Sequence, residues 1–325
     1  MASDNDSVII ATRGSALALA QANLVIGQCR TIFPRLRFEI QIIKTTGDKL
    51  QTTSLASANL PKGLFTKELE VALIQGEADL AVHSLKDLPT ELPAGLKLGA
   101  VSQRADVRDV LIYRNASVAV PGVSGFEPGL SIRKLPAAAT IATSSERRRA
   151  QLLEARPDLK IVPIRGNVPT RLQKLAERPA MDAIILAAAG LERLDFQIGS
   201  DGRLSGEAVP EGLLARQLEV EEMLPCVGQA ALGIEVRAQD GRMASICEGL
   251  NHYATQQCVT AERAFLKAMG GGCQIPVAAY AQAVDKQLHI RGVSFLGEKI
   301  RRGQARRPMD EAEQLGCDLA GQLKG

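Results

Sequence analysis

The feature that most constrains the fold is a pattern that occurs twice, in which a short strand-like run ends in small polar residues and is followed by a helix-like run. It occurs first where Val8–Thr12 leads into Arg13–Ser15, and again where Ala139–Thr143 leads into Ser144–Ser145. Strands that alternate with helices are typical of α/β architecture. The sequence therefore predicts an α/β fold, and a length of 325 residues favours two or three domains.

The same alternation continues along the chain. Further strands are predicted at Phe38–Thr45, Asp79–Ser84, Val110–Tyr113, Lys160–Ile164, Asp182–Leu186, Ala231–Arg237, Val277–Ala283, Gln287–Phe295 and Lys299–Gln304. Helices are predicted at Ala16–Cys29, Thr66–Gln75 with Thr66 as its cap, Glu146–Ala155, Val168–Glu177, Met243–Leu250, Ala254–Met269 and Asp310–Leu323.

Composition narrows the class of protein. A net charge of +3 gives no general case for binding nucleic acid or a membrane, and apolar runs such as Ala183–Leu191 are too short to span a bilayer. The segment Met1–Asp6 lacks the apolar region that a secretory signal requires. The six cysteines are widely scattered along the chain, which favours reduced thiols over disulfides. We therefore expect a cytoplasmic protein, with a mature plastid form left open, and no metal site.

Positive charge is concentrated locally. The segment Thr143–Arg171 carries six arginines and one lysine against three acidic residues. Arginines near helix N-termini suit bidentate binding of carboxylates or phosphates. For either helix start alone, ordinary capping with solvated arginines is the better interpretation. A nucleic-acid surface ranks below a small polyanion, because aromatic residues make up only 3% of the chain and tryptophan is absent.

Two further segments could carry chemistry. His83–Asp87 ends a predicted strand, where a carboxylate could stabilise a cation or transfer a proton, although a surface Lys/Asp pair is the more common arrangement. His83 itself fits a core histidine better than a ligand. Gly270–Cys273 places a thiol after three glycines, which allows either an idle cysteine or a covalent attachment point.

Together these segments resemble the porphobilinogen deaminase family. The motifs that carry the resemblance follow one another in the family's order from about Ile9 to Tyr280: Arg13–Leu19, Lys62–Glu70, Ala81–Pro89, Thr143–Ser145 with Arg147 and Arg148, Arg165–Asn167 with Thr170–Leu172, Leu186–Ala187 with Ala189–Leu191, and Gly271–Pro276. The combination is highly specific to that family.

The resemblance implies three α/β domains: residues 1–104 with 226–245, residues 105–225, and residues 246–325. The first two are expected to resemble the lobes of a periplasmic binding protein, and the smaller third to carry a dipyrromethane cofactor. The implied reaction removes ammonia from porphobilinogen to give an azafulvene, which the growing pyrrole chain attacks. Four rounds and a hydrolysis release hydroxymethylbilane. The family is usually monomeric.

The resemblance also implies roles for individual residues. Asp87 would be the catalytic group, and Cys273 would hold the dipyrromethane in a thioether. Other cofactor-binding residues would be Lys86, Thr143, Ser145, Arg147, Arg148 and Arg171. Substrate-binding residues would be Arg13, Ser15, Lys62, Phe65, Arg165 and Arg193.

This sequence departs from the family pattern in places. Relatives often have a glycine pair before the motif that starts at Lys62, where this chain has Leu60 and Pro61. The segment covers the site in the family, and Pro61 would stiffen it. Ala230 stands where glycine is usual, and the loops at Asn115–Pro136 and Asp195–Met223 look long. A two-lobed anion- or tetrapyrrole-binding protein without catalysis is the alternative function.

Overall fold

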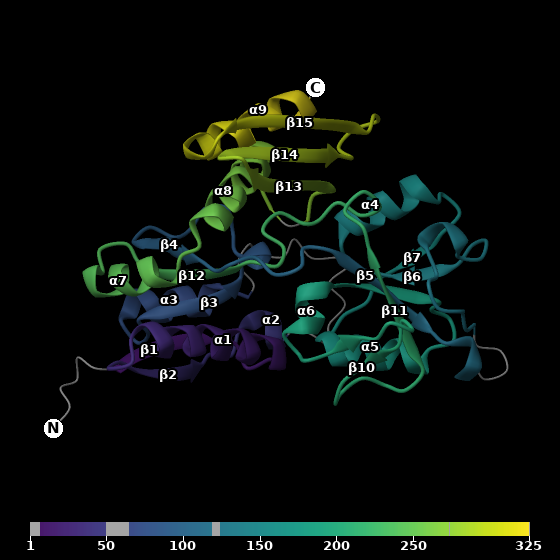
Figure 1. The fold of residues 1–325 in the computed structure, drawn as a ribbon, viewed down its shortest axis with the longest axis horizontal. Coiled ribbons are helices and arrows are strands. Elements are labelled where there is room, and N and C mark those ends of the chain that lie inside the picture. Colours follow the sequence, from purple (N-terminus) through teal and green to yellow (C-terminus); the bar gives the residue numbers. More distant parts are fainter. Residues whose placement is uncertain (1–6, 50–64, 119–123, 273, 325) are drawn as a thin grey trace.

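Three main β-sheets, each packed with helices, and one two-stranded ribbon make up the described part of the chain (Figure 1). The computed structural model describes residues 7–49, 65–118, 124–272 and 274–324. Two of these sheets have five strands and lie side by side, and the third, with three strands, lies above them in the view of Figure 1.

The first sheet has the order β2-β1-β3-β12-β4. Its strands are β1 (Ser7–Thr12), β2 (Arg37–Ile42), β3 (Leu80–Ser84), β4 (Leu96–Val101) and β12 (Leu232–Arg237). Strand β1 is parallel to β2 and β3, whereas β12 is antiparallel to both β3 and β4. Strand β4 was not predicted from the sequence.

Helices cover both faces of this sheet because successive strand residues point to opposite sides. Ile10 packs with α1 (Ala16–Ile32) and α7 (Gly241–Leu250), whereas Ala11 packs with α3 (Lys67–Gln75). A short helix, α2 (Thr46–Lys49), follows β2. Thr66 is the N-cap residue of α3 as predicted, but its side chain makes no capping hydrogen bond, because its backbone is already helical.

The second sheet, β7-β6-β8-β5-β11, repeats the topology of the first. Its strands are β5 (Asp109–Arg114), β6 (Thr140–Ala142), β7 (Lys160–Val162), β8 (Ala183–Ala187) and β11 (Leu213–Leu218). Strand β6 is parallel to β7 and β8, while β5 is antiparallel to both β8 and β11. Helix α4 (Glu146–Ala155) packs on one face, and α5 (Val168–Glu177) and α6 (Ala188–Glu192) pack on the other.

The chain crosses between these two lobes twice. It leaves the first after β4, enters the second at β5, and returns from β11 to β12, the fourth strand of the first sheet. A small ribbon of β9 (Gln197–Ile198) and β10 (Leu204–Ser205) lies before β11 within a segment predicted to be a loop. Strand β11 was also missed by the sequence prediction.

The third sheet is the antiparallel set β13 (Val277–Val284), β14 (Gln287–Ser294) and β15 (Arg301–Pro308). Helices α8 (Tyr253–Ala268) and α9 (Ala312–Lys324) pack on it through a shared apolar core. The predicted class, two α/β lobes with a smaller α/β C-terminal domain, is confirmed. The exact domain limits stay a prediction.

Candidate active site

The parallel strands of the first lobe bring two predicted segments to one edge. Strands β1 and β3 are parallel neighbours, so their carboxyl ends meet there. Ser15 follows β1 and caps α1, since its Oγ accepts a hydrogen bond from the amide of Ala18 at 3.3 Å. The guanidinium of Arg13 lies 4.3 Å from the ring centroid of Phe65, a cation–π contact. Three predicted substrate-binding residues therefore have defined places in this lobe.

Asp87 lies in a 3₁₀ turn, Leu85–Asp87, directly after β3. Leu85 and Leu88 are buried in an apolar cluster that includes Val259 of α8. Because the flanking leucines occupy the core, Lys86 remains half-buried and Asp87 is exposed. The local sequence thus presents a carboxylate from a rigidly anchored turn.

Lys86 lies close to groups from the second lobe. Burial lowers the pKa of Lys86, and the nearby guanidinium of Arg148 lowers it further. Asp87, Cys226 and Asp109 raise that pKa, but they do not offset the burial. Arg148 and Asp109 belong to the second lobe, so Lys86 lies where the two lobes approach each other.

Thr143 and Ser145 organise the corresponding strand end in the second lobe. Ser145 caps α4 by accepting a hydrogen bond from the amide of Arg148 at 3.4 Å. The amide of Ser145 in turn donates to Oγ1 of Thr143 at 3.2 Å. The interpretation of this motif as an ordinary helix cap is therefore confirmed for Ser145.

The same interpretation is wrong for the arginines, because Arg147 and Arg148 are buried rather than solvated. Arg147 Nη2 donates to Asp109 Oδ2 at 2.8 Å, and Arg148 Nη2 donates to Asp109 Oδ1 at 2.6 Å. Burial tends to raise the pKa of Asp109, but the two guanidiniums outweigh it and hold the pKa well below its usual range. One carboxylate thus orients both arginines.

Each of these arginines keeps an unused donor. Within the described part of the chain, the buried Nε atoms of Arg147 and Arg148 have no hydrogen-bond partner. Arg147 also donates to the carbonyl of Leu224 at 2.7 Å, and Arg148 to the carbonyl of Ile185 at 2.8 Å. Two guanidiniums and one carboxylate also leave an excess positive charge in a buried place, where an anion would be stabilised.

Arg165 and Arg171 extend the positive surface of the second lobe. Arg165 is exposed, and Arg171 is fixed by a bond from its Nε to the carbonyl of Gly166 at 2.7 Å. Burial, together with Arg148 and Arg165, lowers the pKa of Arg171 to about 10, while Asp87 opposes that shift. Arg171 of the second lobe thus lies near Asp87, the predicted catalytic group of the first lobe.

Arg193 reaches the crossover between the lobes. Its Nη2 donates to the carbonyl of Ala230 at 2.6 Å, and burial lowers its pKa to about 10. Ala230 has a φ of 73°, in the left-handed region that favours glycine, which explains why glycine would suit this position. Arg193 therefore also helps to fix the crossover.

Two predicted site residues, Lys62 and Cys273, lie outside the described residues.

Sequence reasoning missed Asp109, Gln229 and Cys226. Gln229 is fully buried and donates to the carbonyl of Val107 at 2.7 Å and to Asp109 at 3.1 Å. The one available signal was Asp109, a charged residue directly before the apolar run Val110–Tyr113.

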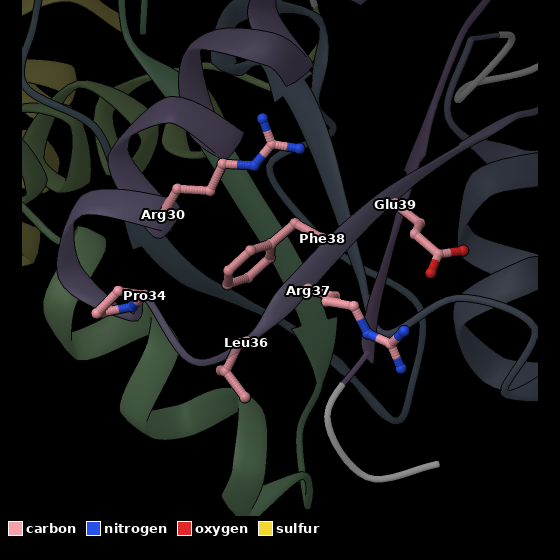
Figure 2. A pocket seen from close by; sticks show the side chains of 6 residues that line it. All are labelled: Arg30, Pro34, Leu36, Arg37, Phe38 and Glu39. Atoms are coloured by element: carbon pink, nitrogen blue, oxygen red, sulfur yellow. The ribbon is translucent and has the colours of Figure 1, made fainter. Parts of the chain in front are cut away.

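Other features of the described residues lie apart from this site. A hollow on the first lobe lies between the end of α1 and β2, and Figure 2 shows its lining: Arg30, Pro34, Leu36, Arg37, Phe38 and Glu39. It contains no predicted site residue. No group of three or more His, Cys, Asp or Glu side chains in the described residues could hold a metal, and no described helix could span a bilayer.

Comparison with known proteins identifies the family. Residues 8–245 match the family model "Porphobilinogen deaminase, dipyromethane cofactor binding domain", and residues 256–325 match the C-terminal domain of porphobilinogen deaminase. The porphobilinogen deaminase of Carboxydothermus hydrogenoformans is 42% identical over 97% of this chain and 93% of that protein. The Desulforudis audaxviator protein of the same name is 45% identical over 97% and 94%.

Among solved structures, the BenM effector-binding domain with benzoate has a TM-score of 0.41 and 15% identity, covering 75% of this chain and 90% of that one. This likeness is too low to support any inference.

The fold and the site define a two-lobed α/β protein whose lobes meet at a cluster of basic groups suited to a small polyanion. The chain belongs to the porphobilinogen deaminase family. It is therefore a transferase of tetrapyrrole biosynthesis that joins porphobilinogen units on a dipyrromethane cofactor and yields hydroxymethylbilane. Membership favours this enzyme over the non-catalytic anion-binding protein considered above.

Proposed function

We propose that Asp87 is the catalytic carboxylate of this reaction and that Cys273 carries the dipyrromethane. The observation that carries the proposal is the position of Asp87, which is exposed in the turn that directly follows β3. That turn is bound to the crossover, because the amide of Leu85 donates to the carbonyl of Ala231 at 3.0 Å. Gln229 of the same crossover donates to Asp109, the carboxylate that orients the paired arginines of the second lobe. A substrate between the lobes would face an acid on one side and cations on the other.

Asp87 suits the chemistry because positive charge develops on porphobilinogen as ammonia leaves. A fixed carboxylate stabilises that charge and accepts hydrogen bonds from pyrrole N–H groups. The anchoring of Leu85 and Leu88 keeps the carboxylate in position, so little reorganisation is needed as the charge forms.

The basic residues fit the acidic side chains of the cofactor and substrate. Pyrrole rings of this pathway carry acetate and propionate groups, and the guanidiniums of the second lobe suit such carboxylates. When bound, the dipyrromethane supplies the pyrrole carbon to which the first substrate is joined. Binding of the cofactor would fall to the set Lys86, Thr143, Ser145, Arg147, Arg148 and Arg171, and binding of the substrate to the set Arg13, Ser15, Lys62, Phe65, Arg165 and Arg193.

The decisive test of the catalytic assignment is Asp87→Ala. We expect at least a hundredfold loss of kcat, since removing one preorganised electrostatic group typically costs about 10²–10³. The free energy of unfolding should change by less than about 0.5 kcal/mol, because Asp87 is exposed. Glu77→Gln, at another exposed acid of the first lobe, is the matched control. Near-normal bilane production by Asp87→Ala would refute the role.

Cofactor attachment is tested by an intact mass and an Ehrlich colour reaction on the purified protein. We expect a mass above that of the sequence by one dipyrromethane, with a positive colour. An unmodified mass that persists after incubation with porphobilinogen would contradict attachment to this chain.

We also infer that the chain works as a monomer and without nucleic acid. The small net charge of +3 supports the second inference, because nucleic-acid binding favours a strongly basic surface. Light scattering should give the mass of one chain, and a mass of two chains would contradict the first.

A further inference from the structure

One face of α8 lies along the segment that follows Asp87. Arg263 of α8 donates from Nη1 to the carbonyl of Leu88 at 3.1 Å and from Nη2 to the carbonyl of Pro89 at 2.6 Å. One turn further on, Lys267 Nζ lies 3.0 Å from a carboxylate oxygen of Glu91. Residues four apart share a helix face, so these contacts form one continuous seam.

The seam continues past the end of the helix. A Cβ built on Gly271 would lie 3.6 Å from Oγ1 of Thr90, so the backbone there passes close to the same segment. The amide of Gly271 donates to the carbonyl of Leu266 at 2.8 Å, which ties this turn to α8. The C-terminal domain therefore follows the segment from Leu88 to Glu91 over just over one turn of α8 and into the glycine turn beyond it.

The contacts of the seam lie close in sequence to both residues with proposed roles in the reaction. Leu88 and Pro89 come directly after Asp87, and Cys273 follows the glycines that end α8. Figure 1 shows α8 between the third sheet and the sheet of the first lobe. The Arg263 guanidinium is thus a direct link between the helix that leads to the attachment residue and the turn that carries the catalytic one.

The contacts of the seam are unequal in strength. Lys267 and Glu91 have side chains that are 60% and 72% exposed, so water screens their attraction and the pair contributes little. Arg263 is half-buried. Burial lowers its pKa to about 10, an effect that the nearby buried Glu235 opposes, so the guanidinium stays charged at neutral pH. Charged donors make the stronger hydrogen bonds, and only arginine has a fork that reaches two successive carbonyls.

The turn beneath the seam is also held by apolar packing and by a hydrogen bond from the amide of Leu85 to the carbonyl of Ala231 at 3.0 Å. Val259, one turn before Arg263 on the same helix, packs in the cluster with Leu85 and Leu88. Val259 restrains the buried side of the turn, whereas Arg263 restrains the backbone carbonyls on the side that leads away from Asp87.

We propose that Arg263 is a positioning residue of the reaction, which fixes the Asp87 turn relative to the helix that precedes the cofactor attachment residue. The inference rests on the proposed roles of Asp87 and Cys273. Arg263 touches neither reacting group and acts through the carbonyls of Leu88 and Pro89. A displacement of about 1 Å at a reacting pair can reduce the rate by about a hundredfold.

The test compares Arg263→Met, which keeps much of the apolar stem but removes the fork, with Lys267→Met on the same helix face. Both are purified as the full chain, and cofactor occupancy is measured by intact mass. We expect Arg263→Met to lower kcat per cofactor-loaded molecule by between tenfold and a hundredfold, with KM for porphobilinogen changed less than threefold. Lys267→Met should stay within twofold of the wild type in both constants.

A second readout does not depend on turnover. Amide hydrogen exchange of residues 85–91 should speed up in Arg263→Met and remain unchanged in Lys267→Met. Arg263→Lys, which keeps the charge but loses the fork, should show an intermediate kcat and exchange rate, and it serves if the methionine variant folds poorly.

A kcat within twofold of the wild type in loaded Arg263→Met or Arg263→Lys, or unchanged exchange over residues 85–91, would overturn the positioning role. Asp87→Ala is measured in parallel. Activity retained in Asp87→Ala refutes the catalytic assignment, whereas loss there with full activity at Arg263→Met refutes only the positioning role.

Discussion

Replacing Asp109 by asparagine should destabilise the second lobe more than any exposed change of charge there. Asp109 is fully buried and pairs with both Arg147 and Arg148, at 2.8 and 2.6 Å. Asparagine keeps the shape but not the charge, so two adjacent buried guanidiniums would lose their counterion. Gln229, which donates to the same carboxylate, can donate to the asparagine oxygen as well.

The magnitude follows from the burial of the group. Removing one partner of a buried ion pair costs about 3–5 kcal/mol. For a lobe of this size, that corresponds to a fall in melting temperature of about 10 °C or more. The assay is urea and thermal denaturation of Asp109→Asn beside the wild type, with both loaded with cofactor to the same extent.

The matched control is Asp201→Asn in the same lobe. Its partner Arg203 lies 3.8 Å away, and both side chains are more than 60% exposed, so we expect a change of no more than about 0.5 kcal/mol. A loss below about 1 kcal/mol in Asp109→Asn would refute the view that this carboxylate holds the paired arginines.

The pH dependence supplies an independent check. The folded-state pKa of Asp109 is depressed, so its contribution to stability is complete above the unfolded pKa of about 3.9 and is lost as the pH falls toward the folded value. The difference between the wild type and Asp109→Asn should therefore be constant from pH 5 to 8 and shrink below pH 4. A difference that declines between pH 7 and 5 would implicate another group.

Three further changes have clear expectations. Gly316→Ala should lower the free energy of unfolding by about 3 kcal/mol or more, since the new Cβ would lie 2.1 Å from the carbonyl oxygen of Ala261. Gly321→Ala in the same helix places its Cβ where nothing lies within 4 Å, so it should raise the free energy of unfolding by about 0.5–1 kcal/mol. Thermal melts of the two variants distinguish the steric effect from the effect of helix propensity. Ala230→Gly should raise the free energy of unfolding by up to about 1 kcal/mol by relieving a left-handed backbone, and a lower urea midpoint would argue against strain there. Cys273→Ser should leave no covalent pyrrole in the intact mass, and a normal adduct would move the attachment elsewhere.

Strong local signals explain which elements could be predicted. Helices α4 and α5 match their predicted limits because each begins at a capping side chain, Ser145 and Asn167 respectively. Strand β4 escaped prediction because Lys97 and Gly99 interrupt its apolar pattern, and Gly99 is required there by contact with the Cys247 side chain. Such a strand is defined by its neighbours and not by its own residues.

The types of residue in the site could be predicted from the sequence, but the residues that bind them could not. The clustering of arginines near Arg147 and Arg148 indicated an anion site. Nothing in the sequence near Asp109 indicated that it would bind both, because Asp109 lies 38 residues before Arg147 and the two meet only in the folded lobe. Likewise the spacing along α8 gave no sign that Arg263 would reach the turn of Asp87.

The arrangement of charge explains why a permanently attached anionic cofactor suits the cluster of basic groups between the two lobes. Lys86 and Arg171 both have lowered pKa values, because each is desolvated and each lies near the Arg148 guanidinium. Asp109 neutralises only one of the two guanidiniums that it contacts, so the remaining cations of the site repel one another. Such a site is stabilised by any carboxylate that enters it, and a group joined to the chain by a covalent bond provides those carboxylates at every turnover without a cost of association. The same excess charge leaves basic groups for the carboxylates of each substrate added.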